Sequence, residues 1–205
     1  MTPSYELWTA LLSLLLGSLV VMGSPGPSTI SATAVGAAFG FRRSLPYCLG
    51  LILGTTAVLI AVACGIVSLL LSVPQLAHLL ILGSALYMVY LALKIATAPP
   101  LSEMRLDTAA PSFVGGFLLA VSNPKAFLAI AAVFASSSLG FQSRLIEAAL
   151  TIAVLAAMIV AIHVFWLMAG VSFSRLLRHP VSSRIVNISL AAILVVTAGL
   201  ALIRI

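Results

Sequence analysis

The residue of this chain with the clearest chemical potential is Lys125, which directly follows Asn123 and Pro124. It lies in a long apolar stretch, because the nearest charged residue before it is Asp107 and the nearest after it is Arg144. A cation in the middle of a membrane costs roughly 2.5–3.5 kcal/mol on insertion scales, so such residues usually face a cavity and have a function there. We expect Lys125 to bind an anionic group, such as a carboxylate.

A second group of candidate binding residues is Ser24-Pro25-Gly26-Pro27, followed by Ser28. Proline removes a backbone donor and clashes with the preceding turn, so a helix should break there and also at Asn123-Pro124. Ser and Asn are favoured N-caps, and Pro is favoured at the first helical position. Each break is therefore predicted to start a half-helix whose free N–H groups, together with Lys125, attract an anion. Alternatively, the prolines only kink packed helices.

Composition indicates which elements position these residues. The chain is 62% hydrophobic and 7% charged, and residues 7–41 and 44–93 contain no Asp, Glu, Lys or Arg. A membrane span needs about 20 apolar residues, which predicts a polytopic all-α membrane protein with one domain. The net charge of +6 could suggest nucleic-acid binding. The basic residues lie between hydrophobic segments, however, as orientation signals do.

Turn residues divide the chain into six predicted spans, at 7–39, 45–71, 76–96, 112–135, 145–172 and 185–203. Lys and Arg in the connecting segments are distributed unequally between the two sides of the membrane. One side holds Arg42, Arg43, Lys94, Arg105, Arg175, Arg178 and Arg184, and the other holds Arg144 and Arg204. The positive-inside rule then places both termini outside the cytoplasm.

The two halves of the chain resemble each other. We predict repeat one at 1–100, a linker at about 99–111 and repeat two at 112–205, within a single domain over 1–205. The aligned pairs are Ser24-Pro25 with Asn123-Pro124, Gly40-Phe41 with Gly140-Phe141, Gly65 with Gly170, and Leu91-Ala92-Leu93 with Leu200-Ala201-Leu202. Three helices per half would invert the second repeat, as in secondary transporters, and would bring the two breaks head to head. Hydropathy symmetry without homology is the alternative.

Several motifs resemble the lysine exporter (LysE/RhtB) family of bacterial amino-acid exporters over nearly the whole chain. They are Pro25-Gly26-Pro27, Gly40-Phe41-Arg42-Arg43, Gly50-x-x-x-Gly54, Leu82-Gly83-Ser84-Ala85-Leu86-Tyr87-x-x-Tyr90-Leu91, and Gly115-Gly116-Phe117-Leu118 before Asn123-Pro124-Lys125-Ala126. The resemblance implies export of amino acids or derivatives across the cytoplasmic (inner) membrane, driven by the proton motive force. Two positions depart from the family: Ser28 stands where Asn or Asp is common, and Val58 stands near a common His.

These observations together give a hypothesis for substrate binding. Lys125 and the half-helix N–H groups hold the carboxylate of an amino acid, hydroxyl and amide groups add hydrogen bonds, and carbonyls near Gly26 receive its ammonium. The predicted binding residues are Lys125, Asn123, Pro124, Ser24, Pro25, Gly26, Pro27, Ser28, Tyr87 and Tyr90. The two tyrosines would shape the side-chain pocket, although their spacing is more typical of packing or of the membrane interface. No acidic residue lies deep in a predicted span, which favours a neutral over a basic amino acid.

Lys125 and His163 are the candidates for carrying the coupling proton. His163 is the titratable group other than Lys125 that lies well inside a span, and an imidazole changes charge between pH 5 and 8. A buried histidine that is simply hydrogen-bonded to a neighbouring helix is the alternative. The sequence cannot choose between Lys125 and His163.

Other classes of function are less well supported. A membrane-embedded enzyme needs paired carboxylates, a histidine-rich metal set or a nucleophile–base pair, and the spans offer none of these. A metal-ion or other small-solute exporter on the same scaffold is the main alternative, but Cys48, Cys64 and one histidine make a poor ligand set. A scaffold protein would not require Lys125 within hydrocarbon. We expect no metal or cofactor. Gly50-x-x-x-Gly54 could pair two copies in a homo-oligomer or pack internally.

Overall fold

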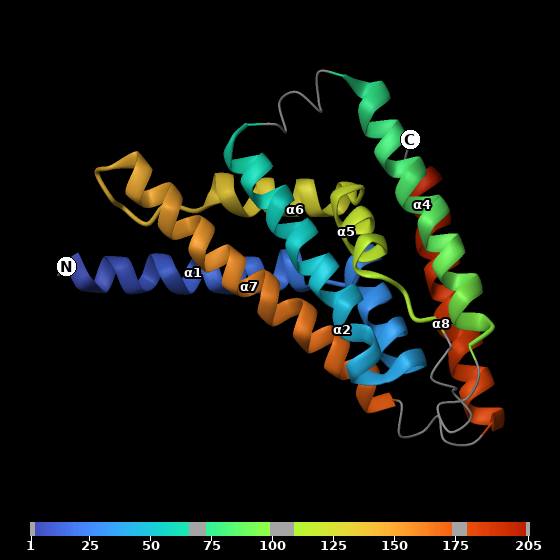
Figure 1. Ribbon diagram of the computed structural model, residues 1–205. Coiled ribbons are helices and arrows are strands. Elements are labelled where there is room, and N and C mark those ends of the chain that lie inside the picture. Colours follow the sequence, from blue (N-terminus) through green and yellow to red (C-terminus); the bar gives the residue numbers. More distant parts are fainter. Residues whose placement is uncertain (1–2, 66–72, 99–108, 174–179, 204–205) are drawn as a thin grey trace.

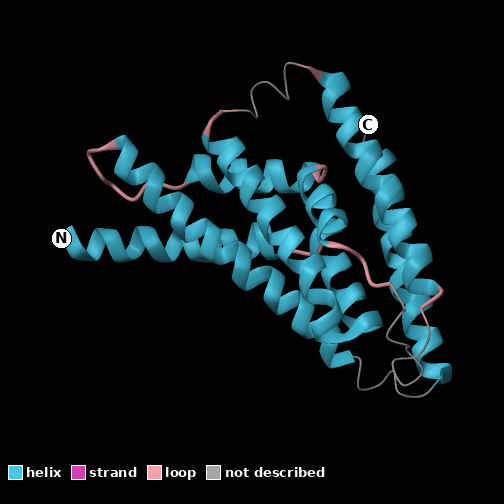
Figure 2. Cartoon of the chain, viewed as in Figure 1, coloured by secondary structure: helices cyan, strands magenta, loops and turns pink. Residues whose placement is uncertain are grey.

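The computed structural model describes residues 3–65, 73–98, 109–173 and 180–203, and these are helical with short connections. The helices are α1 (Pro3–Gly23), α2 (Pro27–Ala63), α4 (Pro74–Ala96), α5 (Phe113–Val121), α6 (Pro124–Ser136), α7 (Arg144–Phe173) and α8 (Pro180–Ile203). No strand occurs among the described residues (Figure 2). The prediction of an all-α fold is confirmed for this part of the chain.

Both predicted helix breaks are present. The first predicted segment, 7–39, is divided between α1 and α2 at Ser24-Pro25-Gly26. The fourth, 112–135, is divided between α5 and α6, which meet at an angle of 60°. Proline explains both positions, because its ring removes a hydrogen-bond donor from the preceding helix and suits the first position of the next.

The predicted turn at Gly40-Phe41-Arg42-Arg43 is present at its first residue. Helix α2 consists of two helical segments that meet at Gly40, whose backbone is not helical, with φ of 72° and ψ of 174°. Glycine adopts this left-handed φ without a Cβ clash, so one residue suffices to redirect the helix. The Ser44 hydroxyl lies 2.6 Å from the Gly40 carbonyl oxygen and 3.0 Å from the Val35 carbonyl oxygen, so its single hydrogen can be shared between them and link the two segments.

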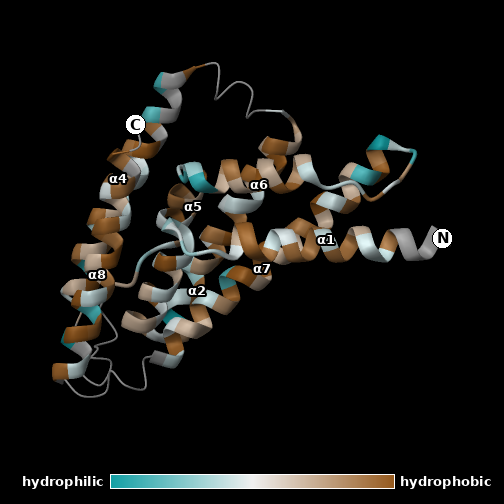
Figure 3. Cartoon of the chain, turned by 180° about the vertical axis from the view of Figure 1, so that it is seen from behind, coloured by the Kyte–Doolittle hydropathy of each residue, from teal (hydrophilic) through white to brown (hydrophobic). Residues whose placement is uncertain are grey.

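The lengths of the helices identify the candidate membrane spans. Within the described residues, α2 and α7 are each long and apolar enough to cross a membrane, and the bent pair α5–α6 would make a third span. Shorter apolar stretches lie in α1, α4 and α8. Apolar residues cover much of the outer surface (Figure 3), as expected of helices that face lipid. The six-span inverted arrangement stays a prediction.

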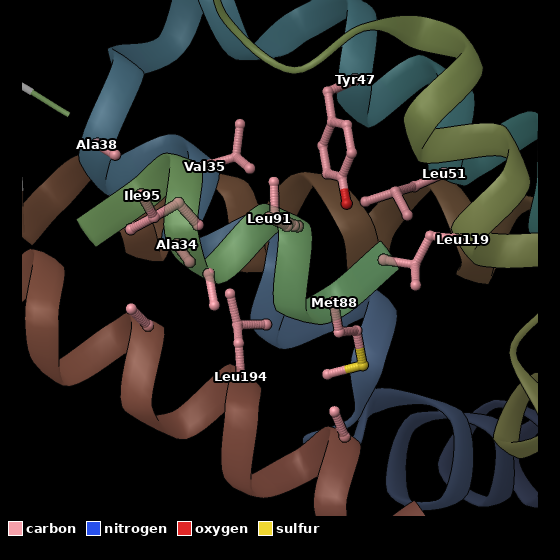
Figure 4. Close-up of a cluster of buried hydrophobic side chains, with 14 of the residues drawn as sticks. Ala34, Val35, Ala38, Tyr47, Leu51, Met88, Leu91, Ile95, Leu119 and Leu194 are labelled. Carbon is pink, nitrogen blue, oxygen red and sulfur yellow. The ribbon is translucent and has the colours of Figure 1, made fainter. Parts of the chain in front are cut away.

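Helix α2 is the centre of the packing, with its most extensive contacts to α7 and α5, while α4 and α8 lie side by side (Figure 1). One buried apolar cluster joins α2, α4, α5 and α8, and Figure 4 shows Tyr47, Met88 and Leu194 within it. A second cluster joins α1, the C-terminal part of α2, α6 and α7. The breaks in the first and fourth predicted segments belong to the helices of this second cluster.

Glycines bring the backbones of α2 and α5 into direct contact. A Cβ added to Gly50 would meet the carbonyl oxygen of Phe113, and one added to Gly116 would meet the carbonyl oxygen of Tyr47. Gly54 lies similarly close to Phe117. Of the two roles considered for Gly50-x-x-x-Gly54, internal packing is the one that this structure contains.

Two local features recur at positions that the predicted internal repeat aligns. The helical segments 27–39 and 124–136 each begin with proline directly after a break. Each is followed by a glycine of positive φ, Gly40 at 72° and Gly140 at 78°. These two glycines were aligned on sequence alone. The repeat boundaries remain a prediction, and residues 99–108 of the predicted linker lie outside the described residues.

Candidate functional site

The two helix breaks are bonded to each other through Lys125. Its ammonium nitrogen donates to the Ser24 carbonyl at 2.6 Å, to the Ser24 hydroxyl at 2.9 Å and to the Pro25 carbonyl at 2.9 Å. A lysine ammonium has three N–H donors, so all of them are engaged by the first break. A fourth bond crosses the junction from the Asn123 amide nitrogen to the Ser28 hydroxyl oxygen, at 3.0 Å.

The second break is capped as the sequence predicts. The Asn123 side-chain oxygen accepts from the Lys125 backbone N–H at 3.1 Å, and Pro124 occupies the first helical position of α6. Asn123 thus uses its oxygen for the cap and its nitrogen for Ser28. Since the cap fixes the start of α6, it also fixes the direction from which Lys125 leaves the backbone.

The first break begins its new helix two residues later than predicted. Its cap is Gly26 with Pro27 at the first helical position, and the Gly26 N–H donates to the Thr29 hydroxyl at 2.9 Å. Ser24 instead belongs to the end of α1, where its hydroxyl donates to the Val21 carbonyl at 2.9 Å. The predicted N-cap role of Ser24 is therefore wrong. Either proline could start a helix, and the sequence could not show which one does.

The end of α1 is also held by α7. The indole nitrogen of Trp166 donates to the carbonyl of Gly23 at 3.1 Å, and the Thr33 hydroxyl donates to the carbonyl of Trp166, also at 3.1 Å. The last carbonyls of a helix lack intrahelical partners and need donors from elsewhere. Here Trp166 and Lys125 supply those donors to neighbouring residues of the first break.

A pocket lies at the junction of the breaks, with about 420 Å³ of space that includes the part open to solvent. Its lining comes from α1, α2, α6, α7 and the two breaks. The lining residues are Met22, Ser24, Gly26, Ser28, Thr29, Thr55, Asn123, Lys125, Ala126, Ala129, Ile130, Ile159, Ile162 and His163. Lys125 is the charged residue of this lining, and no carboxylate is part of it.

The pocket unites some of the predicted binding residues and omits others. Lys125, Asn123, Ser24, Gly26 and Ser28 line it, and His163 does so as well. The remaining predicted residues, Pro25, Pro27, Pro124, Tyr87 and Tyr90, are not part of the lining.

The prolines act through the backbone at the breaks, whereas the tyrosines lie elsewhere. The Tyr87 hydroxyl packs against Gly115, beside the cluster that joins α4 to α2 and α5. Tyr90 is 52% exposed on α4, with the Lys94 ammonium 6.0 Å from the centre of its ring. In this structure both tyrosines have the packing or surface role that their spacing also allowed.

Thr55 was not predicted from the sequence. It lies in the C-terminal part of α2, is buried, and its hydroxyl has no hydrogen-bond partner among the described residues. The signal in the sequence was weak, since a threonine in an apolar helix often bonds to its own backbone. Ile130, Ile159 and Ile162 complete an apolar wall from α6 and α7. No group of three or more His, Cys, Asp or Glu that could hold a metal ion occurs in the described part of the chain.

A helical membrane protein in which two broken helices meet around a partly buried ammonium has the architecture of a small-solute transporter. The chain belongs to the LysE type translocator family, whose sequence model matches residues 19–204. This confirms the family resemblance and makes the protein a transporter, not an enzyme.

Its relatives include the cysteine/O-acetylserine efflux proteins of Escherichia coli strain K12 and Shigella sonnei strain Ss046. Each is 35% identical over 182 residues, which cover 88% of this chain and 91% of the relative. No solved structure matches the chain.

Proposed function

We propose that this protein exports neutral amino acids or their derivatives from the cytoplasm across the bacterial inner membrane. The observation that carries the proposal is a pocket with one cation, Lys125, and no carboxylate in its lining. Such a pocket suits a carboxylate on the substrate and offers no counter-charge to a basic side chain. The relatives named as cysteine/O-acetylserine efflux proteins agree with a small neutral substrate.

Binding of a carboxylate would change the junction between the breaks. Because Lys125 already donates to Ser24 and Pro25, a carboxylate has to replace one or more of these acceptors. The exchange is favourable because a charged acceptor makes a stronger hydrogen bond than a neutral carbonyl. The Ser28 hydroxyl, which accepts from Asn123, still has its own hydrogen to donate to the same group.

This exchange provides a route to alternating access. The first break and α6 belong to different predicted repeats, and the Lys125 bonds connect them. A substrate that draws Lys125 away from Ser24 removes part of that connection and allows the repeats to move relative to each other. We propose that the proton motive force drives the cycle, with both termini outside the cytoplasm and with Lys125 or His163 carrying the proton.

Transport by the reconstituted protein tests the proposal. The purified protein in liposomes should exchange labelled L-cysteine, L-serine or O-acetyl-L-serine against the same unlabelled solute, and exchange L-lysine much more slowly. Lys125→Met should abolish the exchange. The proposal is wrong if wild type and Lys125→Met give equal signals with every amino acid. Zn²⁺ uptake in place of amino-acid uptake would favour the metal-ion alternative.

A further inference from the structure

Two polar atoms of the pocket residues have no hydrogen-bond partner among the described residues: Nε2 of His163 and Oγ1 of Thr55. Both side chains are almost fully buried, with 4% and 6% of their surface exposed. A buried polar atom without a partner costs roughly 1–3 kcal/mol, so it needs an explanation. Both residues line the pocket that contains Lys125, although one is on α7 and the other on α2.

The bond at the other ring nitrogen fixes the chemistry of His163. Its Nδ1 lies 2.8 Å from the carbonyl oxygen of Ile159. A carbonyl oxygen can only accept, so Nδ1 carries the hydrogen of the neutral ring. Nε2 is then an unprotonated acceptor. Thr55 adds a hydroxyl, which can also accept.

The other side-chain acceptors around the two breaks are already used. The oxygens of Ser24 and Pro25 accept from the Lys125 ammonium. The Ser28 hydroxyl accepts from Asn123, and the Asn123 oxygen accepts from the backbone N–H of Lys125. The Thr29 hydroxyl accepts from the Gly26 N–H. In this structure the carbonyls expected on sequence grounds to receive a substrate ammonium accept from Lys125, whereas Nε2 of His163 and Oγ1 of Thr55 accept from no described residue.

We propose that Nε2 of His163 and Oγ1 of Thr55 bind the ammonium group of the substrate. The inference rests on the proposed function and deepens it, because it assigns the second charged end of an amino acid. Lys125 on α6 binds the carboxylate, and the α2–α7 side of the pocket binds the ammonium. A site that binds both the carboxylate and the ammonium selects amino acids over simple carboxylic acids of the same size.

The same arrangement makes a proton and an amino acid compete. A protonated imidazole has donors at both nitrogens and a positive charge, so it repels an ammonium instead of accepting from it. Apart from His163 itself, Lys125 on α6 is the titratable residue of the lining. The lining residues from α1 and α2 are not titratable. Protonation of His163 therefore expels the ammonium, and binding of the ammonium keeps the proton off.

A comparison of ligands with and without the amino group tests the assignment. The pairs are L-cysteine with 3-mercaptopropionate and L-serine with 3-hydroxypropionate, and their affinities are measured on the purified full-length protein at pH 8. His163→Phe should weaken amino-acid binding by about 10- to 100-fold and leave the deamino acids unchanged. Thr55→Val should act in the same direction with a smaller effect. Thr151→Val, at a buried threonine outside the pocket lining, is the matched control and should change the affinity for neither ligand.

His163→Gln separates ammonium binding from protonation. The glutamine oxygen can accept from an ammonium but does not titrate, so this variant should bind amino acids as the wild type does at pH 8. It should also lose the decrease in affinity that the wild type shows toward pH 5. Equal losses for both members of a ligand pair in His163→Phe and Thr55→Val would assign these residues a structural role and overturn the inference. A wild type that binds no amino acid at all would instead overturn the proposed function.

Discussion

The side chain of Lys125 occupies the space where a side chain of residue 26 would begin. A Cβ on Gly26 would lie 2.6 Å from Cδ of Lys125 and 2.8 Å from its Nζ. The backbone of Gly26 is extended, with φ of −170°, so its conformation does not require glycine. Residue 26 is therefore glycine because the lysine needs the room.

Gly26→Ala should impair transport without unfolding the protein. The alanine methyl group displaces the flexible lysine side chain, which then loses its contacts with Ser24 and Pro25. We expect the exchange rate of L-cysteine in liposomes to fall by about 10- to 100-fold, the effect of losing hydrogen bonds to a charged group. Gly17→Ala is the matched control, because a Cβ there meets no atom within 4 Å. Equal rates in the two variants would contradict the steric explanation.

Lys125→Met should remove carboxylate binding while keeping a side chain of similar length. Loss of the charge-assisted hydrogen bonds should lower the affinity for L-cysteine by about 10- to 100-fold. It should lower the affinity for 3-mercaptopropionate to the same extent, because both ligands carry the carboxylate. Affinity measurements on the purified variant test this. If only the amino acid were affected, Lys125 would not be the carboxylate ligand.

A comparison of Asn123 with Ser112 separates the effect of losing a helix cap from the effect of losing a contact in the candidate site. Both are helix N-caps, since the Ser112 hydroxyl accepts from the Gly115 N–H at 3.2 Å at the start of α5. Replacing either with alanine should cost about 1 kcal/mol of stability. Only Asn123→Ala also breaks the bond to Ser28, so only it should slow transport beyond its effect on thermal stability. Thermal unfolding in detergent and liposome exchange give the two readouts.

Gly116→Ala should destabilise the protein through the contact of α5 with α2. Its Cβ would meet the backbone of Tyr47, which cannot move aside as a side chain can. Overpacking of this kind costs about 1–3 kcal/mol, and a lower unfolding temperature in detergent would show it. Gly83→Ala, where a Cβ meets nothing within 4 Å, should leave that temperature unchanged or raise it. A Gly116→Ala protein as stable as wild type would show that the two helices are not in backbone contact.

The sequence predicted the parts of the site that depend on local chemistry. Proline marks a break wherever it occurs, Asn123 is a favoured cap, and a lone lysine in an apolar stretch is conspicuous. These local features identified both breaks and placed Lys125 in the candidate site. A glycine next to two arginines likewise marked the turn at Gly40, where the two segments of α2 meet.

The parts that depend on packing could not be predicted. Nothing local distinguishes Thr55 from other threonines in apolar helices, and its place in the lining depends on how α2 packs near α7. The tyrosines at 87 and 90 have spacing that suits a pocket, yet α4 packs against α8 and away from the breaks. Ser24 and Gly26 both precede a proline, so the sequence does not distinguish which of them begins the second helix, and in the structure Gly26 does, with its N–H bonded to the Thr29 hydroxyl.

The indole of Trp166 links the C-terminal end of α1 to α7, the helix that carries His163. Gly23, which accepts this hydrogen bond, immediately precedes Ser24, whose carbonyl accepts from Lys125. Three positions before Trp166 on the same helix stands His163. One indole hydrogen bond and less than one helical turn therefore connect the C-terminal end of α1 to the imidazole of His163. A movement of this end of α1 on binding at Lys125 would therefore act on the His163 side of the pocket through this bond.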